Sequence, residues 1–416
     1  MAKKHNADSQ NKPDIVLWGA TSFIGQLLIA YLWPRYGKSG EVRFALGGRN
    51  RSKLESIHRQ MNADDRLSIT VGDASDDGFL DNLTRNAKLV VSTVGPYAKY
   101  GSPLVEACAR NGTDYCDLTG EPQWMRRMID ANQKTAEESG ARIIHACGFD
   151  SIPSDLGVLF LQHEAQHRFG HALEHVKMRV SSIRGGLSGG TVASILNLVE
   201  EARRDPEIAN IAKNPYALAP EGMRKGIRQD NVSALKFDGD LQKWIGPFIM
   251  AAVNTKVVHR SHALLGCPWG KEFRYDEAMV MGSGIRGALR GAAFAGGLGA
   301  FLLGAGFSPT RALMKTTVLP KPGEGPSPEE QETGFYKLHF IGKSQKGASL
   351  RLKVTGDRDP GYGSTSKMLG ESALCLLKDI ARDELSGGFW TPATAMGRKL
   401  MDRLTSSAGM SFDIHT

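Results

Sequence analysis

Between Asp14 and about Gly148, short apolar runs rich in β-branched residues alternate with segments of helical periodicity. Strands are expected over residues 14–19, 42–48, 67–73, 88–95, 113–120 and 141–148, and helices over 24–36, 53–61, 78–84, 103–110 and 122–139. Strands that are apolar throughout and alternate with helices are typical of a parallel sheet covered on both faces. We therefore expect an α/β fold built on a doubly wound, Rossmann-type parallel sheet.

The chain of 416 residues is too long for one compact core, so we expect two domains. Residues 1–12 form a polar, disordered lead-in, and residues 13–150 form the Rossmann domain. Residues 151–363, with strands near 171–182 and 336–344, form a second α/β (α+β) domain for substrate and assembly. A helical segment, residues 364–416, is expected to pack back onto the first domain.

The composition excludes several functional classes. The net charge of +8 comes from dispersed lysines and arginines, and no nucleic-acid-binding motif is present, so no nucleic-acid partner is expected. The five cysteines are scattered and never spaced as C-x-x-C, which argues against a disulfide framework or a structural zinc site. The polar N-terminus has no apolar signal segment, and we expect a cytoplasmic protein.

The sequence DIVLWGATSFIG places a glycine-rich turn directly after the first strand and before the first helix. In that context the glycine spacing indicates dinucleotide binding, with backbone N–H groups at the helix start facing a pyrophosphate. Serine stands where the middle glycine of the usual pattern would be, and no P-loop lysine follows. The residues expected to contact the cofactor here are Gly19, Ala20, Thr21, Ser22, Phe23, Ile24 and Gly25.

The second strand ends in ALGGRNRSK, which has no acid to bind a ribose 2′-hydroxyl. Arg49, with Arg51 and Lys53, is placed to bind a 2′-phosphate, and we expect NADP(H). The alternative is that these cations are solvated residues at a helix start. After the third strand, Asp73 and Ala74 are expected beside the adenine. After the fourth, the segment expected beneath the nicotinamide ribose consists of Ser92, Thr93, Val94, Gly95 and Pro96.

Candidate proton donors follow or lie within the later strands: Tyr97, Tyr115 and Asp150. For each of them a turn or helix-capping role is as plausible as a catalytic one. No Y-x-x-x-K pair or Ser-His-Asp order identifies the donor.

Two further patterns, a series of histidines and a second glycine-rich stretch, lie beyond the first domain. His163, His167, His171 and His175 recur every four residues, but Gly170 is expected to end the helix and break this stripe, so no metal site is expected. The glycine-rich stretch 181–194, with Thr191 as a candidate N-cap, would form either an anion-binding nest or a tight connection.

The segment 291–308 is uncharged and is flanked by four cations, Arg286, Arg290, Arg311 and Lys315. Its length reaches the lower limit for a membrane span, but its glycine content makes a poor spanning helix. Either an internal packing helix or a peripheral element that contacts lipid or an acyl chain is consistent with this composition.

Together, DIVLWGATSFIG, STVGPYAKYGSPLVEAC, GTDYCDLTGE, ACGFDSIPSDLG and SGGTVAS resemble the saccharopine dehydrogenase-like oxidoreductases, and most closely their actinobacterial trans-acting enoyl reductases. VNTKVVHRS, KPGEGPS and TPATAMG extend the resemblance over nearly the whole chain. It implies an NADP(H)-dependent enzyme that reduces a carbon-carbon double bond of a polyketide or fatty-acyl thioester in lipid biosynthesis. A substrate presented by an acyl-carrier domain and a homo-oligomeric state are further expectations. The family's cofactor motif maps onto Gly19, Thr21, Ser22 and Gly25.

Two other functions remain open on the sequence alone. A saccharopine-like C–N dehydrogenase would need arginines to bind substrate carboxylates, for which Arg184 is a candidate. A non-catalytic, lipid-associated NADP-binding protein would fit the apolar segment and the absence of an identified proton donor.

Overall fold

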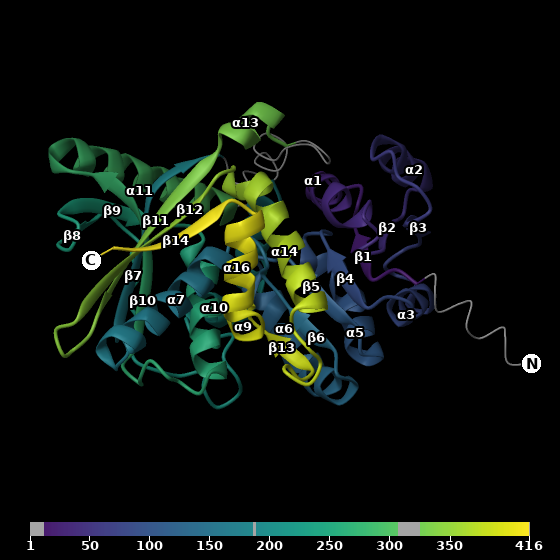
Figure 1. Cartoon of the computed structure of the whole chain (residues 1–416). Coiled ribbons are helices and arrows are strands. Elements are labelled where there is room, and N and C mark those ends of the chain that lie inside the picture. Colours follow the sequence, from purple (N-terminus) through teal and green to yellow (C-terminus); the bar gives the residue numbers. More distant parts are fainter. Residues whose placement is uncertain (1–11, 186–188, 307–324, 416) are drawn as a thin grey trace, which may run out of the picture.

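The computed structural model describes residues 12–185, 189–306 and 325–415, which form two seven-stranded sheets (Figure 1). In the first sheet every strand pair is parallel, and the order is β13-β6-β5-β4-β1-β2-β3. Its strands are β1 (Ile15–Trp18), β2 (Phe44–Gly48), β3 (Leu67–Val71), β4 (Leu89–Ser92), β5 (Asp114–Asp117), β6 (Arg142–Ile144) and β13 (Gly388–Trp390). The Rossmann-type sheet expected from the sequence is confirmed.

The helices of this domain also follow the expected alternation. They are α1 (Phe23–Leu32), α2 (Arg51–Gln60), α3 (Asp77–Arg85), the short α4 (Tyr97–Tyr100), α5 (Ser102–Asn111) and α6 (Pro122–Ser139), with a π-helical turn η2 (Trp33–Gly37) after α1. Strand order reverses between β1 and β4, which lie side by side. The loops at the carboxyl ends of these two strands therefore flank the crevice in which such sheets bind ligands.

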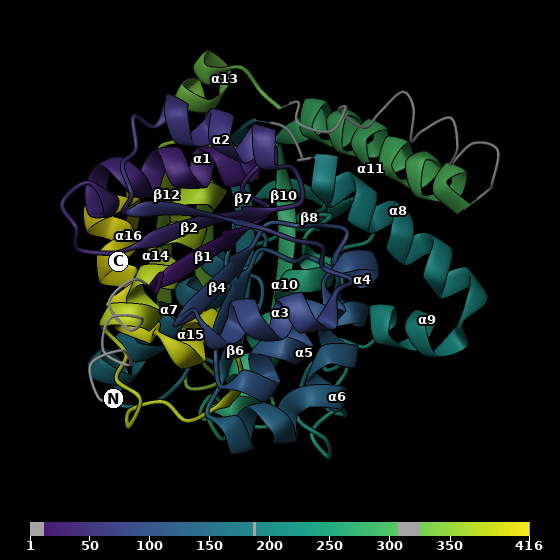
Figure 2. The same ribbon diagram turned by 90° about the vertical axis from the view of Figure 1, so that its right-hand side faces the viewer.

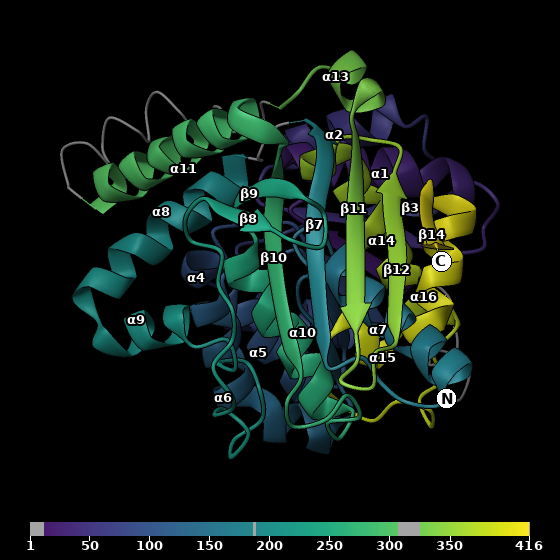
Figure 3. The ribbon, with the colours of Figure 1, turned by 90° about the vertical axis from the view of Figure 1, so that its left-hand side faces the viewer.

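The second sheet is mixed, with the order β14-β12-β11-β7-β10-β9-β8 and β7 parallel to β10. Its strands are β7 (His175–Arg184), β8 (Lys236–Asp238), β9 (Lys243–Pro247), β10 (Arg274–Gly282), β11 (Phe335–Lys343), β12 (Ser349–Gly356) and β14 (Met410–His415). Helices α7 (Ile152–Phe169) and α10 (Ala251–Leu264) lie between the two sheets (Figure 1). Figure 3 looks onto the face of the second sheet that is turned away from these helices.

The remaining helices are α8 (Gly189–Arg204), α9 (Pro206–Lys213), α11 (Gly284–Gly306), α13 (Pro328–Thr333), α14 (Thr365–Lys378), α15 (Pro392–Ala395) and α16 (Gly397–Ser407), with a π-helical turn η3 (Pro360–Ser364) before α14. Helices α8, α9 and α11 lie on one flank of the molecule, away from the first sheet (Figure 2).

The C-terminal segment packs back onto the first domain, as expected. The carboxylate of the fully buried Glu371, in α14, accepts hydrogen bonds from the hydroxyls of Tyr31 (2.7 Å), in α1, and Tyr36 (3.0 Å), in η2. The buried Arg142 of β6 pairs with Asp114 at 2.5 Å and also donates to a backbone carbonyl of α14. The same segment contributes β13 to the first sheet and β14 to the second, two strands that the sequence pattern does not reveal.

Candidate active site

The turn after β1 requires glycine at two positions. Gly19 has a φ of +88°, and a Cβ atom there would lie 2.6 Å from Cγ2 of Val94 and 2.8 Å from Oγ1 of Thr93. A Cβ atom on Gly25 would lie 2.3 Å from the carbonyl oxygen of Gly19. The first glycine thus permits the turn and the second permits the close approach of α1 to it, the two roles that the sequence pattern predicts.

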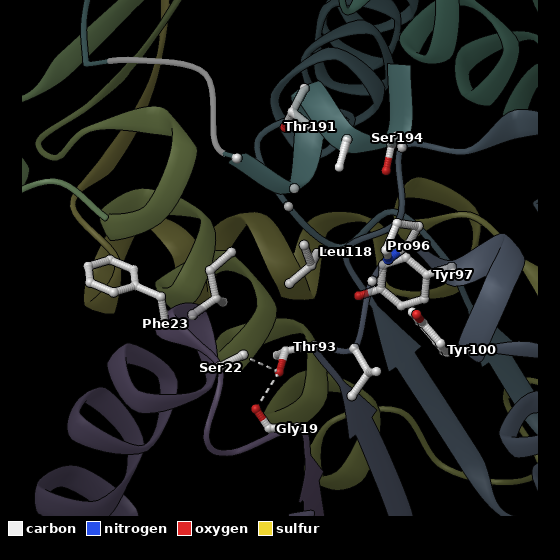
Figure 4. Close-up of a pocket in the computed structure, with 18 of the residues that line it drawn as sticks. Gly19, Ser22, Phe23, Thr93, Pro96, Tyr97, Tyr100, Leu118, Thr191 and Ser194 are labelled. Carbon is white, nitrogen blue, oxygen red and sulfur yellow. Dashed lines mark hydrogen bonds between the residues drawn. The ribbon is translucent and has the colours of Figure 1, made fainter. Parts of the chain in front are cut away.

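Ser22 occupies the middle position of the motif and forms the N-cap of α1. Its hydroxyl oxygen accepts from the backbone N–H of Gly25 at 3.0 Å and lies 2.9 Å from Oγ1 of Thr93 (Figure 4). Thr93 donates its only hydroxyl hydrogen to the carbonyl of Gly19 at 3.0 Å, so in this arrangement the Ser22 hydroxyl is the donor to Thr93. The serine therefore connects the cofactor turn to the loop after β4.

A cationic corner lies beside this turn. Arg49 follows β2 with 78% of its side chain exposed, and Arg51 and Lys53 begin α2 behind the N-cap Asn50. All three cations line a surface pocket together with Thr21. The closest acid to Arg49 is Asp73, with 3.9 Å between Nη1 and Oδ2, a distance that leaves the guanidinium available to a phosphate.

Asp73 is held in a turn of its own after β3. Its carboxylate accepts from the backbone N–H (2.9 Å) and the hydroxyl (2.8 Å) of Ser75. These hydrogen bonds lower the pKa of Asp73 below its usual value, so the carboxylate stays ionised at neutral pH.

One cavity of about 1130 Å³ extends from the glycine turn to the second domain (Figure 4). Most of the residues expected to bind cofactor or act in catalysis line it: Gly19, Thr21, Ser22, Phe23, Ile24, Arg49, Lys53, Asp73, Ala74, Thr93, Val94, Gly95, Pro96, Tyr97 and Asp150. Arg51 lines only the neighbouring pocket. Ala20, Gly25 and Ser92 are buried behind the cavity wall, where they shape the turn without lining the cavity.

The structure does not support Tyr115 as a proton donor. It lies inside β5, its ring is fully buried, and it does not line the cavity. Both faces of this parallel sheet are covered, so a residue inside a strand points into the core, whereas a residue beyond the strand's carboxyl end reaches ligand.

Tyr97 does line the cavity, but its hydroxyl is already engaged. It donates to the backbone carbonyl of Ser92 at 2.9 Å, and its ring packs against Trp124 with centroids 5.2 Å apart. Burial raises the pKa of Tyr97 well above its ordinary value, so the phenol is a weak acid here.

Of the three candidates, Asp150 best fits the role of a proton donor. It follows β6 at the carboxyl end of the sheet and lines the cavity, and among the described residues no group donates a hydrogen bond to its carboxylate. Burial raises the pKa of the Asp150 carboxyl from 3.8 to about 7. The group is thus close to half protonated at neutral pH, the condition under which a general acid is effective.

The far wall of the cavity comes from parts of the second domain that sequence patterns do not bring together. These are Gly189, Gly190, Thr191, Ala193, Ser194, Ile195 and Leu198 of α8, Ile249, Met250, Ala252 and Val253 at the start of α10, and Gly361, Tyr362 and Thr365 around η3. Thr191 and Ser194 lie across the cavity from Gly19 and Thr93 (Figure 4). Helix α8 already begins at Gly189, so Thr191 lies in its first turn and is not the N-cap suggested by the sequence.

Two connections hold this wall against the cofactor domain. The buried carboxylate of Glu121, after β5, accepts from the backbone N–H groups of Tyr97 (2.8 Å) and Ala98 (3.0 Å) and from the hydroxyl of Ser194 (2.9 Å). The ring of Phe23, in the cofactor turn, packs edge-on against Tyr362 with centroids 5.0 Å apart. The hydroxyl of Tyr362 in turn accepts from the backbone N–H at the start of α8 at 2.9 Å.

The histidine stripe ends where expected. Helix α7 stops at Phe169 with Gly170 in a left-handed conformation, so His171 and His175 lie outside it. His175, on β7, instead pairs with Asp276, on β10, with 3.5 Å between Nε2 and Oδ2. Asp230 lies close to the same ring nitrogen. Asp276 is already bound by the buried Arg179 at 2.7 Å, so this group is a charge network in the second sheet.

Comparisons with known proteins agree with this architecture. The NADP-binding domain model of saccharopine dehydrogenase matches residues 15–144. A Mycobacterium tuberculosis protein provisionally named a trans-acting enoyl reductase is 41% identical over 413 residues, with 96% of each chain covered. A trans-acting enoyl reductase of Mycobacterium ulcerans is 38% identical over 417 residues, which cover 96% of this chain and 97% of that one. The solved apo structure of a Saccharomyces cerevisiae saccharopine dehydrogenase (L-Glu forming) aligns with 97% of this chain and 100% of its own, with a TM-score of 0.55 and 10% identity, a likeness of fold.

Proposed function

Because this chain belongs to the saccharopine dehydrogenase-like oxidoreductases, in the branch of the mycobacterial trans-acting enoyl reductases, we propose that it is an NADPH-dependent enoyl reductase. It is an oxidoreductase with an NADP-binding domain. The proposed substrate is a polyketide or fatty-acyl thioester with a double bond next to the thioester carbonyl, presented by an acyl-carrier domain. The observation that carries this proposal is the single cavity that joins the glycine turn, Asp150 and an apolar wall.

The residues of the turn fit NADP(H). A side chain on Gly19 or Gly25 would collide with neighbouring protein atoms, so the tight turn needs both glycines. Helix α1 begins at Phe23, directly after the cavity-lining Thr21 and Ser22, and a helix N-terminus at this place suits a pyrophosphate. Arg49 and Lys53 provide cations for a 2′-phosphate, and no acid lies at the end of β2 or in the first turn of α2 to select a free 2′-hydroxyl. When bound, NADPH supplies a hydride to the β-carbon of the enoyl group.

The chain's own contributions are positioning and proton transfer. Asp150, protonated as above, donates its proton to the α-carbon, so that the double bond becomes a single bond and the carboxylate is left ionised. Ile195 and Leu198 of α8 and Val253 of α10 supply apolar contacts for an acyl chain. The hydroxyl of Tyr97 is bound to the backbone carbonyl of Ser92, so we assign Tyr97 a role in positioning the loop after β4 and not in proton transfer.

A C–N dehydrogenase acting on substrate carboxylates is less well supported. Among the described residues that line the cavity, the cations are Arg49, Lys53 and Lys99, and the first two lie in the cofactor corner. Arg184, at the end of β7, is exposed and does not line the cavity. A site for a dicarboxylate would require arginines at the substrate end.

The test is consumption of NADPH by the purified chain in the presence of 2-enoyl thioesters of pantetheine or of an acyl-carrier domain. Saturated product should form in equal amount with NADP⁺, and NADH should be a poor substitute. Asp150→Asn should retain NADPH affinity and lose most of the turnover. If the chain instead oxidises NADPH only with a 2-oxo acid and an amine, the C–N dehydrogenase is correct and the present proposal is wrong.

A further inference from the structure

Helix α11 packs on the second sheet through its glycines. A Cβ atom on Gly287 would lie 2.3 Å from the carbonyl oxygen of Gly282, and one on Gly291 would lie 2.3 Å from Cδ1 of Leu235. The helix contacts β9 and β10 on this side. Gly287 and Gly291 thus permit close packing of the N-terminal half of α11 on one face.

The opposite face of α11 is apolar and is not covered by any residue in the described ranges 12–185, 189–306 and 325–415. Ile285, Leu289 and Leu303 are 77%, 66% and 67% exposed. At 100° per residue their side chains project within about 40° of one another, and Ala292 and Gly296 continue the same stripe between them. The most apolar 18-residue window within Gly284–Ala305 has a mean hydropathy of 1.4, yet only 11% of that window is buried. We call this stripe the outer face of α11.

This pattern bears on the two expectations for residues 291–308, of which 307 and 308 lie outside the described residues. An internal packing helix would be buried on its apolar side, whereas here Ile285, Leu289 and Leu303 are exposed. A spanning helix would need lipid all around it, and the glycine face is instead held against a sheet. A helix fixed along one side and apolar along the other is suited to lie in the plane of an interface.

The charges on α11 favour an anionic surface. Arg286 and Arg290 are exposed beside the outer face, and α11 contains no acidic residue. A second copy of this chain would bring the same two cations to the contact and no acid from its own α11. Anionic lipid headgroups would pair with both arginines while the apolar stripe enters the acyl boundary.

Helix α8 lies between α11 and the cavity. Its buried Val192 and Leu196 form a small apolar cluster with Ala305 of α11. Residues on another side of the same helix, Ser194 and Ile195, line the cavity. Helices α8 and α11 lie side by side on one flank of the molecule (Figures 2 and 3). Helix α8 thus separates α11, and with it the outer face of α11, from the cavity.

We propose that the outer face of α11 attaches the protein peripherally to an anionic lipid surface. The helix lies flat, Arg286 and Arg290 meet headgroups, and the three exposed aliphatic side chains enter the hydrocarbon boundary. Attachment places α8 and the adjoining side of the cavity near that surface, where long acyl chains partition. The attachment itself does not depend on the proposed reaction.

The experiment is flotation of the full chain with vesicles of phosphatidylcholine containing phosphatidylglycerol, compared with vesicles of phosphatidylcholine alone. The unaltered protein should float with the anionic vesicles, and less so as salt rises. The triple variant Ile285→Ser, Leu289→Ser and Leu303→Ser should bind at least about tenfold more weakly, since three exposed aliphatic groups no longer enter the lipid. The variant Arg286→Gln with Arg290→Gln should lose the preference for anionic vesicles.

Leu265→Ser is the matched control, because Leu265 is 42% exposed but lies beyond α10. It should float like the unaltered protein. All variants should keep the same NADPH affinity, which shows that they fold. The proposal is overturned if the unaltered chain does not float at low salt, or if the triple variant floats equally well. If the chain sediments as a dimer that the triple variant dissociates, with no vesicle binding, the outer face is an interface between copies.

Discussion

The hydroxyl of Ser22 lies 2.9 Å from the hydroxyl of Thr93, and this contact joins the turn after β1 to the loop after β4. These two segments flank the point where the strand order reverses, on either side of the expected cofactor. Serine in place of the usual middle glycine is thus more than a tolerated exception, because its side chain caps α1 and fixes the neighbouring loop.

Replacing Ser22 tests this role. Ser22→Ala removes the cap and the bond to Thr93, and should lower the free energy of unfolding by about 1 kcal/mol. Ser22→Gly should cost only a few tenths of a kcal/mol, since glycine is itself an acceptable N-cap, and should leave NADPH binding intact. Chemical denaturation and cofactor titration of the two variants measure these effects. Loss of NADPH binding in Ser22→Gly would mean that the hydroxyl is a direct cofactor ligand.

Gly19→Ala should abolish detectable NADPH binding. The added methyl group would be forced to within 2.6 Å of Val94 and 2.8 Å of Thr93, at a positive φ that alanine avoids. The turn must move, and we expect a loss of stability of about 1–2 kcal/mol as well. Gly140→Ala is a suitable control, because Gly140 also has a positive φ (+80°) but ends α6 with nothing within 4 Å of its Cβ position. It should lose stability and keep NADPH affinity.

Arg49→Ala should weaken NADPH binding by about 1.5–3 kcal/mol, the range for a hydrogen bond to a charged group, and change NADH binding little. Arg59→Ala, an exposed arginine near the end of α2 that lines neither pocket, should affect neither cofactor. Calorimetric titration with both cofactors provides the comparison. Equal affinity of the unaltered protein for NADPH and NADH would contradict the assignment of the cationic corner to a 2′-phosphate.

Asp150 should make turnover dependent on pH. The protonated carboxyl is the proposed donor, so the rate should fall as pH rises past the pKa of about 7. In Asp150→Asn the remaining activity should lose this dependence. A rate in the unaltered enzyme that is flat across that range would exclude Asp150 as the donor whose protonation limits turnover.

The same group should affect stability with a defined sign. Its pKa is raised on folding from 3.8 to about 7, so the unfolded chain loses the proton first and stability falls as pH rises between these values. Asp155 and Glu277, whose pKa values burial also raises to about 7, act in the same direction. Asp150→Asn should remove only the contribution of Asp150 to this loss, and should therefore be more stable than the unaltered protein above pH 7 by on the order of 4 kcal/mol. Urea unfolding at several pH values measures the difference.

Glu121→Gln should loosen the wall of the cavity. The carboxylate accepts three hydrogen bonds, from two backbone N–H groups and from Ser194, whereas a glutamine offers only one acceptor atom. A buried donor would be left without a partner, at a cost of about 1–3 kcal/mol in stability. The KM for the thioester should rise more than that for NADPH. An unchanged Tm would show that the three bonds are dispensable.

The first domain was predictable because its signals are local. Strands β1, β2 and β4 are predominantly apolar runs, each strand from β1 to β6 is followed by a helix, and the glycines and Arg49 lie at fixed offsets from those strands. The sequence does not show that Tyr115 lies inside β5 and away from the cavity, because the pattern around it does not separate the interior of β5 from the loop that follows it. Only the burial of both faces of the sheet distinguishes the two.

The second half of the cavity was not predictable in this way. Ile195, Val253 and Tyr362 come from three segments far apart in the sequence, and only tertiary packing brings them together. The three-residue strand β13 is too short for a periodic signal, and it is specified by its parallel pairing with β6. The composition around α11 identified an unusual segment but not which of its sides faces outward, since that depends on the sheet beneath it.

The contribution of residues 388–415 to both sheets constrains the order of events during synthesis. β13 forms the edge of the first sheet beside β6, and β14 forms the edge of the second beside β12. A ribosome that has translated the whole Rossmann sequence has therefore not yet produced the final strand of that sheet. The nascent molecule must keep the outer edge of β6 uncovered until more than half of the polypeptide has followed it, a period in which a chaperone could occupy that edge.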